Sequence, residues 1–126
     1  VLTRLVTDSR YKNSKFIELS LAQLAETARK FFDFRGAVNA YQALVAKFPD
    51  SKYTKAAFYQ SALLNAAMGK YEDAARLFEQ YSHRFEASKN ASQSLYTAAR
   101  YMEKAGNPSG AAKYYSEFIK RFGDEP

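Results

Sequence analysis

Few side chains in this sequence could do chemistry, and their spacing does not bring them together. His83 is the only histidine and cysteine is absent, which excludes a histidine pair for a metal, a thiolate nucleophile and a cysteine metal site. An HExxH motif, a phosphate-binding glycine loop and a nucleophile elbow are also absent. Glu72 and Asp73 stand where a helix should begin, and acidic side chains there interact favourably with the helix dipole. We therefore predict no catalytic residue, no cofactor and no metal site, with a helix-terminal or solvated role for His83.

Composition describes a folded chain with a basic first half. The 126 residues are 47% apolar, and no stretch approaches the roughly 18 consecutive apolar residues of a membrane-spanning helix. The chain starts without a charged and then apolar leader, so we expect a mature protein or a piece of a longer one. Residues 1–70 carry 11 basic and 5 acidic side chains, whereas residues 71–126 carry 8 of each. This bias could steer an acidic partner or an anionic lipid surface, but no basic run or regular base-stacking code predicts a nucleic-acid partner.

The apolar residues recur at an interval of 37 residues. Small residues occupy two phases of the repeat and aromatic residues two more: Ala25, Ala62 and Ala99; Ala37, Ala74 and Ala111; Tyr41, Phe78 and Tyr115; Phe48, Phe85 and Phe122. Within each repeat the apolar positions fall into two segments with helical spacing, so each repeat should form two helices. The alanines should lie where helices cross too closely for larger side chains. One pair alone leaves an apolar face in water, so the pairs should stack into an elongated array.

The turns between the paired helices also repeat. Gly69 and Gly106 can take the left-handed conformation that ends a helix, and Asn107 with Pro108 should then cap and open the next helix. Phe32 occupies the same position in the first repeat. Either that turn is built differently, or Phe32 adopts an unfavourable backbone conformation at a cost of about 1 kcal/mol.

These residues resemble the tetratricopeptide repeats. The second repeat carries the resemblance through a large residue at Phe58, a small one at Ala62, a turn with Gly69 and Tyr71, and the pair Ala74 and Phe78; the first repeat adds the closing proline at Pro49. The sequence departs from the family pattern at Ser61, Asn65, Glu86, Met102 and Gly123. The resemblance implies an all-α fold, an α-solenoid of antiparallel helix pairs wound into a right-handed superhelix.

The connections between repeats resemble a bacterial variant of the family. Residues 48–53, 85–90 and an upstream copy at 11–16 place Ser14, Ser51 and Ser88 at intervals of 37, where a serine can accept backbone N–H groups before a helix. This pattern is similar to repeats of the outer-membrane-assembly lipoprotein and of the periplasmic Tol-Pal coordinator. We predict a single domain in which residues 1–10 end a preceding helix and residues 15–48, 52–85 and 89–122 are the repeats. The resemblance implies a periplasmic or outer-membrane-associated location, with the cytoplasm as the alternative.

A partner-binding surface is the function that the resemblance implies. In the family, the first helix of each pair lines the concave surface, and the matching positions here are Gln23, Glu26, Lys30, Tyr59, Gln60, Leu63, Tyr96, Thr97, Arg100 and Lys104. Tyrosines offer flat contact area with a polar tip, and Arg100 and Lys104, one turn apart, could meet a carboxylate. The opposing interpretation is that the tyrosines are packing residues and the cations are solvated. The paired lysine and asparagine clamp for C-terminal carboxylates is not evident.

Two functions follow as alternatives. The first is a non-enzymatic scaffold that binds a peptide or protein, in bacterial envelope assembly or maintenance. The second is a regulatory or positioning segment of an enzyme whose catalytic domain lies outside these residues. The last helix should carry Tyr115, Phe118 and Ile119 without a polar helix to cover them, so we also expect a longer array or self-association through its ends.

Overall fold

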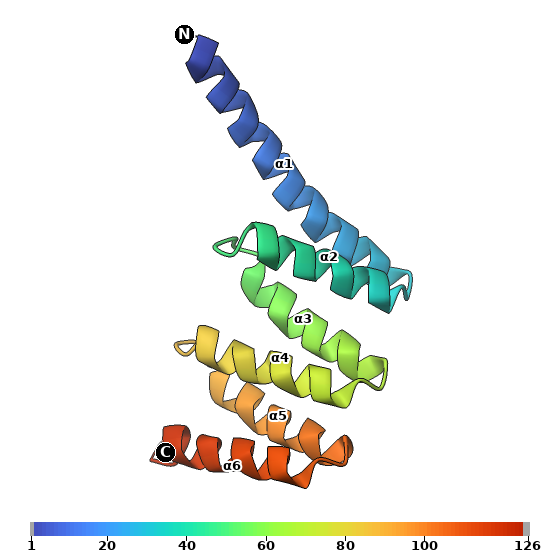
Figure 1. The fold of residues 1–126 in the computed structure, drawn as a ribbon, viewed down its shortest axis with the longest axis vertical. Coiled ribbons are helices and arrows are strands. Elements are labelled where there is room, and N and C mark those ends of the chain that lie inside the picture. Colours follow the sequence, from blue (N-terminus) through green and yellow to red (C-terminus); the bar gives the residue numbers. More distant parts are fainter. Residues whose placement is uncertain (1, 125–126) are drawn as a thin grey trace. The chain divides into compact units, whose positions relative to one another are not determined.

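The computed structural model describes residues 2–124, and the side chains of residues 12–124. The chain forms six helices, namely α1 (Leu2–Lys30), α2 (Phe34–Lys47), α3 (Thr54–Ala67), α4 (Tyr71–Arg84), α5 (Ala91–Lys104) and α6 (Pro108–Phe122), and residues 2–124 contain no strand (Figure 1). The all-α prediction is therefore confirmed. Contacts divide the chain into two compact units, Val1–Thr54 and Lys55–Pro126. None of the described helices is long and apolar enough to cross a bilayer.

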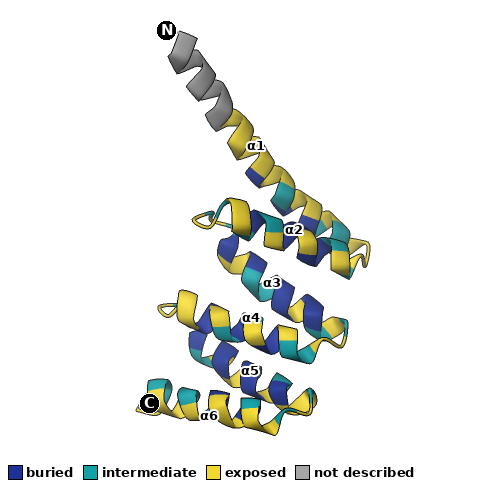
Figure 2. Ribbon diagram, viewed as in Figure 1, coloured by how far each residue is buried: buried dark blue, intermediate teal, exposed yellow. Residues whose placement is uncertain are grey.

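The first unit is one pair of helices, in which α1 packs against α2. Ala25 and Ala37 are fully buried, and Tyr41 and Leu44 extend the core along α2. Figure 2 shows this as dark blue segments of α1 and α2 beside exposed yellow ones. The small side chains let the helices approach closely, as their phase in the repeat predicts.

The second unit contains two helix pairs. Its core draws residues from all four helices: Ala62, Ala75, Phe78, Leu95, Ala98, Ala99, Met102, Ala111 and Tyr114. Helix α5 packs against both α4 and α6, and Figure 2 shows dark blue, buried segments along it. The alanines predicted at the crossings, including Ala62, Ala74 and Ala99, have no exposed surface. The remaining prediction, that all residues form a single domain, stays a prediction.

Three turns of the same construction close α1, α3 and α5. Gly69 and Gly106 have φ of 79° and 76°, as predicted, and Phe32 takes the same left-handed conformation with φ of 64°. The residue that follows each of these left-handed residues donates its backbone N–H to the carbonyl five residues earlier. Asp33, for example, donates to Ala28 at 2.8 Å. Of the two alternatives for the first turn, the strained one is correct, since the hydrogen bonds fix the backbone whatever the side chain.

The helix starts that follow these turns differ in their caps. The Asn107 side chain accepts from the Gly110 N–H at 2.9 Å with Pro108 at the first helical position, as predicted. Asp33 caps α2 in the same way through Gly36. At the equivalent position before α4, Lys70 makes no side-chain cap hydrogen bond. One helix of the three therefore begins with its N–H groups less well satisfied.

The connections between repeats confirm one prediction and correct another. Ser51 accepts from the Tyr53 N–H at 3.1 Å, and Ser88 accepts from the Asn90 N–H at 3.3 Å, so both hydroxyls organise the chain before a helix. The upstream copy is different, because α1 runs unbroken from Leu2 to Lys30 and Ser14 lies inside it. Residues 2–10 are therefore part of α1 and do not end a separate helix. Residues 11–16 contain no proline or glycine, and nothing in their backbone chemistry interrupts a helix. The side chains of residues 1–11 lie outside the described residues.

Candidate functional site

The ten residues predicted to bind a partner fall into two groups. Gln23, Glu26 and Lys30 lie on α1 in the first unit. The other seven lie in the second unit, on α3 and α5: Tyr59, Gln60, Leu63, Tyr96, Thr97, Arg100 and Lys104.

In the first unit, Glu26 is held by its own neighbours. Its carboxylate lies 2.7 Å from Arg29 Nη2 and accepts a hydrogen bond from the Tyr41 hydroxyl at 3.4 Å. Burial, with the negative charge of Glu26, raises the pKa of Tyr41, so the phenol remains a neutral donor. The hydrogen bond to Glu26 raises the pKa of Arg29. Glu26 therefore ties α1 to α2, while Gln23 and Lys30 are exposed.

In the second unit, a pocket of about 70 Å³ lies between α3, α4 and α5. Three of the predicted residues, Tyr59, Leu63 and Thr97, meet in its wall. The residues that complete the wall were not predicted: Phe78, Asn90, Gln93, Ser94 and Tyr101. Two of these had a signal in the sequence, because Gln93 and Ser94 stand four and three residues before Thr97 and share a face of one helix with it.

The polar part of this wall has spare hydrogen-bonding capacity. The Thr97 hydroxyl donates to the Gln93 backbone carbonyl at 2.8 Å, and Gln93 itself is exposed. Ser94 is buried, and its Oγ has no hydrogen-bond partner among the described residues. A buried hydroxyl without a hydrogen-bond partner is uncommon, and a polar group of a ligand could bond to it here. This pocket, lined by Tyr59, Leu63, Gln93, Thr97 and the residues named above, is called the α3–α5 pocket below.

The two predicted tyrosines pack in equivalent ways but differ in exposure. The Tyr59 ring lies edge-on to Phe78 and Tyr81, with centroids 5.7 and 5.6 Å apart. Thirty-seven residues later Tyr96 meets Tyr115 and Phe118 at 5.8 and 5.9 Å. Tyr59 is half-buried, whereas Tyr96 is 43% exposed. Both tyrosines are thus packing residues, although Tyr59 also lines the pocket and Tyr96 stays partly exposed.

The two predicted cations do not point to one place. Arg100 lies 3.7 Å from Glu103, and a hydrogen bond with Tyr96 raises its pKa. Lys104 instead places its Nζ over the rings of Tyr71 and Tyr101, 5.6 and 5.7 Å from their centroids. It lines a different hollow beside the start of α4. Joint binding of a carboxylate by Arg100 and Lys104 stays a prediction, as does a contact through Gln60.

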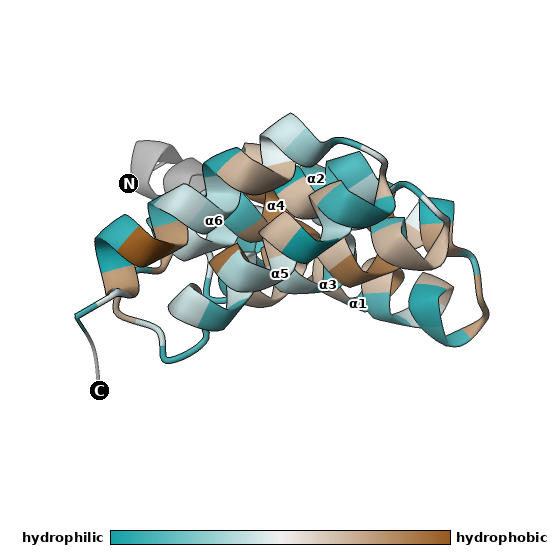
Figure 3. Cartoon of the chain, turned by 90° about the horizontal axis from the view of Figure 1, so that it is seen from below, coloured by the Kyte–Doolittle hydropathy of each residue, from teal (hydrophilic) through white to brown (hydrophobic). Residues whose placement is uncertain are grey.

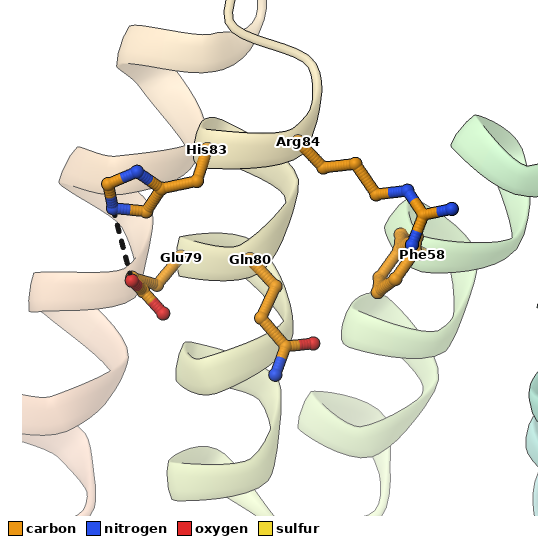
Figure 4. Close-up of a pocket in the computed structure, with 5 residues that line it drawn as sticks. All are labelled: Phe58, Glu79, Gln80, His83 and Arg84. Carbon is orange, nitrogen blue, oxygen red and sulfur yellow. Dashed lines mark ion pairs between the residues drawn. The ribbon is translucent and has the colours of Figure 1, made fainter. Parts of the chain in front are cut away.

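Beside α4, the structure forms a cluster that the sequence did not predict. His83 Nε2 lies 3.2 Å from a Glu79 oxygen and 2.5 Å from a Glu117 oxygen of α6. Figure 4 shows His83 and Glu79 turned to one side of α4, while Arg84 extends over the ring of Phe58 on the other. The hollow lined by Phe58, Glu79, Gln80, His83 and Arg84 is about 500 Å³. The i, i+4 spacing of Glu79 and His83 was the only signal in the sequence, since Glu117 is distant along the chain.

The adjacent acids Glu72 and Asp73 have a structural role. Both lie in the first turn of α4, where they pair with Arg76 at 3.3 and 3.0 Å. Their charges also offset the dipole of a helix that has no side-chain cap. This arrangement agrees with the interpretation made from the sequence.

The α6 surface is partly apolar. Figure 3 shows brown segments interleaved with teal along α6, and Ile119 is 68% exposed. Tyr115 and Phe118 are half-buried beneath Tyr96. Self-association through this surface stays a prediction.

Comparison with known proteins supports the resemblance. A family model described as a tetratricopeptide repeat matches the chain three times, at residues 20–51, 56–88 and 93–124. These matches cover well over half of the chain and each takes in one helix pair, with the first beginning inside α1. No curated protein matches the chain.

Proposed function

The chain belongs to the tetratricopeptide-repeat family, and on that premise we propose that it binds an extended peptide segment of a protein partner through the α3–α5 pocket. The family's repeats generally mediate protein–protein interaction and are not catalytic. The single observation that carries the proposal is the meeting of Tyr59, Leu63 and Thr97 in one pocket wall. The family resemblance implies that these three positions belong to the partner-binding surface.

The chemistry of the pocket suits a short apolar side chain with its flanking backbone. Tyr59, Phe78 and Tyr101 supply an aromatic base, and Leu63 adds an exposed aliphatic edge. Gln93 and Asn90 offer amides that can exchange hydrogen bonds with a peptide backbone. At about 70 Å³ the pocket is far smaller than the roughly 300–1,000 Å³ of small-molecule and cofactor sites. Its size therefore favours one anchoring side chain over a buried cofactor.

The wider biological setting is part of the same proposal. The connections at Ser51 and Ser88 are similar to those of envelope repeats, which supports a role in bacterial envelope assembly or maintenance in the periplasm or at the outer membrane. The alternative is a regulatory or positioning segment of a larger enzyme. Fractionation of the native cells and the mass of the full gene product distinguish the two: envelope location without a catalytic domain supports the first, and a fused catalytic domain supports the second.

Peptide selection tests the binding proposal directly. A displayed library of random peptides is selected against the chain, and the dissociation constants of enriched peptides are measured for Leu63→Asp, which places a charge at the exposed edge of the pocket. We expect binding to weaken at least about tenfold, the equivalent of about 1.4 kcal/mol. Lys113→Glu, at an exposed position of α6, is the matched control and should bind as the wild type does. Equal loss in both variants, with helix content retained, contradicts the proposal.

A further inference from the structure

We propose that Glu79, His83 and Glu117 form a binding site for a divalent transition-metal cation, with Zn²⁺ as the best fit. The three side chains offer one imidazole nitrogen and two carboxylate oxygens, and these ligand atoms all lie within 4.8 Å of one another. Glu79 and His83 come from one face of α4, and Glu117 comes from α6. Two helices therefore present the ligands.

The separations approach those of a metal site. Zinc binds imidazole nitrogen and carboxylate oxygen at about 2.0–2.2 Å, so ligand atoms around a tetrahedral ion lie about 3.4 Å apart. The distance from His83 Nε2 to the Glu79 oxygen is already 3.2 Å. The 2.5 Å distance to Glu117 has to open by roughly 1 Å, which rotations of a long side chain can supply. Three protein ligands leave a fourth position for water or for a group on a partner.

The ligand types favour a transition metal over magnesium or calcium. Imidazole suits zinc, copper and nickel, whereas magnesium and calcium take oxygen ligands almost entirely. Two carboxylates also balance the charge of a divalent ion. The Arg121 guanidinium is a positive charge beside these ligands, with Nη1 3.9 Å from a Glu117 oxygen. Its guanidinium also donates to the Ser82 carbonyl and hydroxyl at 2.9 and 3.1 Å, and these bonds anchor it beside the cluster instead of within it.

The consequence is a link between α4 and α6. An ion held by ligands from both helices binds only the folded arrangement, so it should raise the thermal stability of the second unit. The neighbouring hollow, lined by Phe58, Gln80 and Arg84, opens beside two of the ligands.

Proton NMR of the 126-residue chain without an affinity tag tests the site. Because His83 is the only histidine, its carbon-bound imidazole protons report on this position alone. Titration with ZnSO₄ should shift them until roughly one ion is bound per chain, and MgCl₂ at the same concentrations should leave them unchanged. Imidazole signals that do not respond to zinc overturn the proposal.

Three variants separate this site from incidental binding. Glu79→Gln and Glu117→Gln keep the side-chain size and should each weaken zinc binding at least about tenfold. Glu103→Gln, on α5 away from the cluster, is the control and should bind zinc as the wild type does. If a variant loses its helical circular dichroism, His83→Gln tests the site at an exposed position, with zinc binding followed by titration calorimetry because this variant has no imidazole signal. Unchanged zinc affinity in a folded Glu117→Gln contradicts the inference.

Discussion

The ring of Tyr59 lies edge-on to the ring of Phe78, with centroids 5.7 Å apart and planes at 83°. The pair recurs as Tyr96 and Tyr115 at 5.8 Å and 64°. The surroundings differ, because α5 covers Phe78 with the stacked ring of Tyr101, while Tyr115 is only half-buried. One interaction thus occurs twice in this chain at two depths of burial.

This relationship predicts unequal costs for the two tyrosines. Tyr59→Ala should lower the free energy of unfolding by about 2–4 kcal/mol, because it opens a cavity beside Phe78 and Tyr81. Tyr96→Ala should cost about 1 kcal/mol, since its side chain is partly exposed. Urea denaturation followed by circular dichroism measures both values. Tyr59→Phe, which keeps the ring, is the control and should stay within about 1 kcal/mol of the wild type. Equal costs for the two alanine variants would show that burial does not decide the effect.

The missing cap of α4 predicts a stabilising substitution. Lys70 has φ and ψ of −89° and 70°, close to the −86° and 76° of Asp33, which does cap its helix. Lys70→Asn should therefore let a side-chain oxygen accept the Asp73 N–H and raise the free energy of unfolding by about 0.5–1 kcal/mol. Lys70→Ala removes the same charge without adding an acceptor. A gain shared by both variants would assign the effect to charge and not to the cap.

The left-handed backbone of Phe32 predicts a second substitution that should raise the free energy of unfolding. Phe32 is 80% exposed, so the aromatic ring offers little burial to offset its backbone strain. Phe32→Gly should raise the free energy of unfolding by about 1 kcal/mol, after the entropy of the glycine is counted. Phe31→Gly is the matched control, because Phe31 is equally exposed but has no positive φ, and it should not stabilise. Thermal melts of both variants measure the difference; a lower melting temperature in Phe32→Gly argues against strain at this turn.

The lowered pKa of Glu18 predicts that the stability of the first unit depends on pH. A hydrogen bond from Ser51, with the charge of Lys15 3.6 Å away, lowers the pKa of this carboxyl, which is 8% exposed. Because the pKa is lower in the folded state, the stabilisation is present above the pKa of the unfolded chain and is lost as pH falls through the folded value. The urea midpoint should therefore decrease less between neutral pH and about pH 3 in Glu18→Gln than in the wild type. An equal decrease of the midpoint in both proteins would show that Glu18 does not contribute to the loss of stability in acid. Glu86→Gln, at an exposed position, controls for the loss of a carboxylate.

The sequence was sufficient for the features that depend on the backbone and on burial. The 37-residue interval predicted the buried alanines at Ala25, Ala62 and Ala99, because close helix crossings impose the same steric limit in each repeat. Asn107 and its proline predicted the start of α6 through local hydrogen bonding. The break near residue 11 was wrong, since a repeated letter pattern does not force a turn where no residue opposes a helix.

Side-chain contacts between repeats could not be predicted from the 37-residue interval. Glu117 is the repeat equivalent of Gln80, so its contact with His83 has no counterpart elsewhere in the array. Lys104 was expected beside Arg100, but the rings of Tyr71 and Tyr101 hold its ammonium in another direction. Both outcomes depend on rotamers and on neighbours distant in sequence, which periodicity does not specify.

The most direct test of the α3–α5 pocket is to map backbone amide shifts while a selected peptide is added to isotope-labelled protein. Binding in the pocket predicts the largest changes at Leu63, Gln93 and Thr97 and their sequence neighbours, with the amides of α2 unaffected. Changes confined to α6 or to the first unit, with those three residues unmoved, would contradict the account.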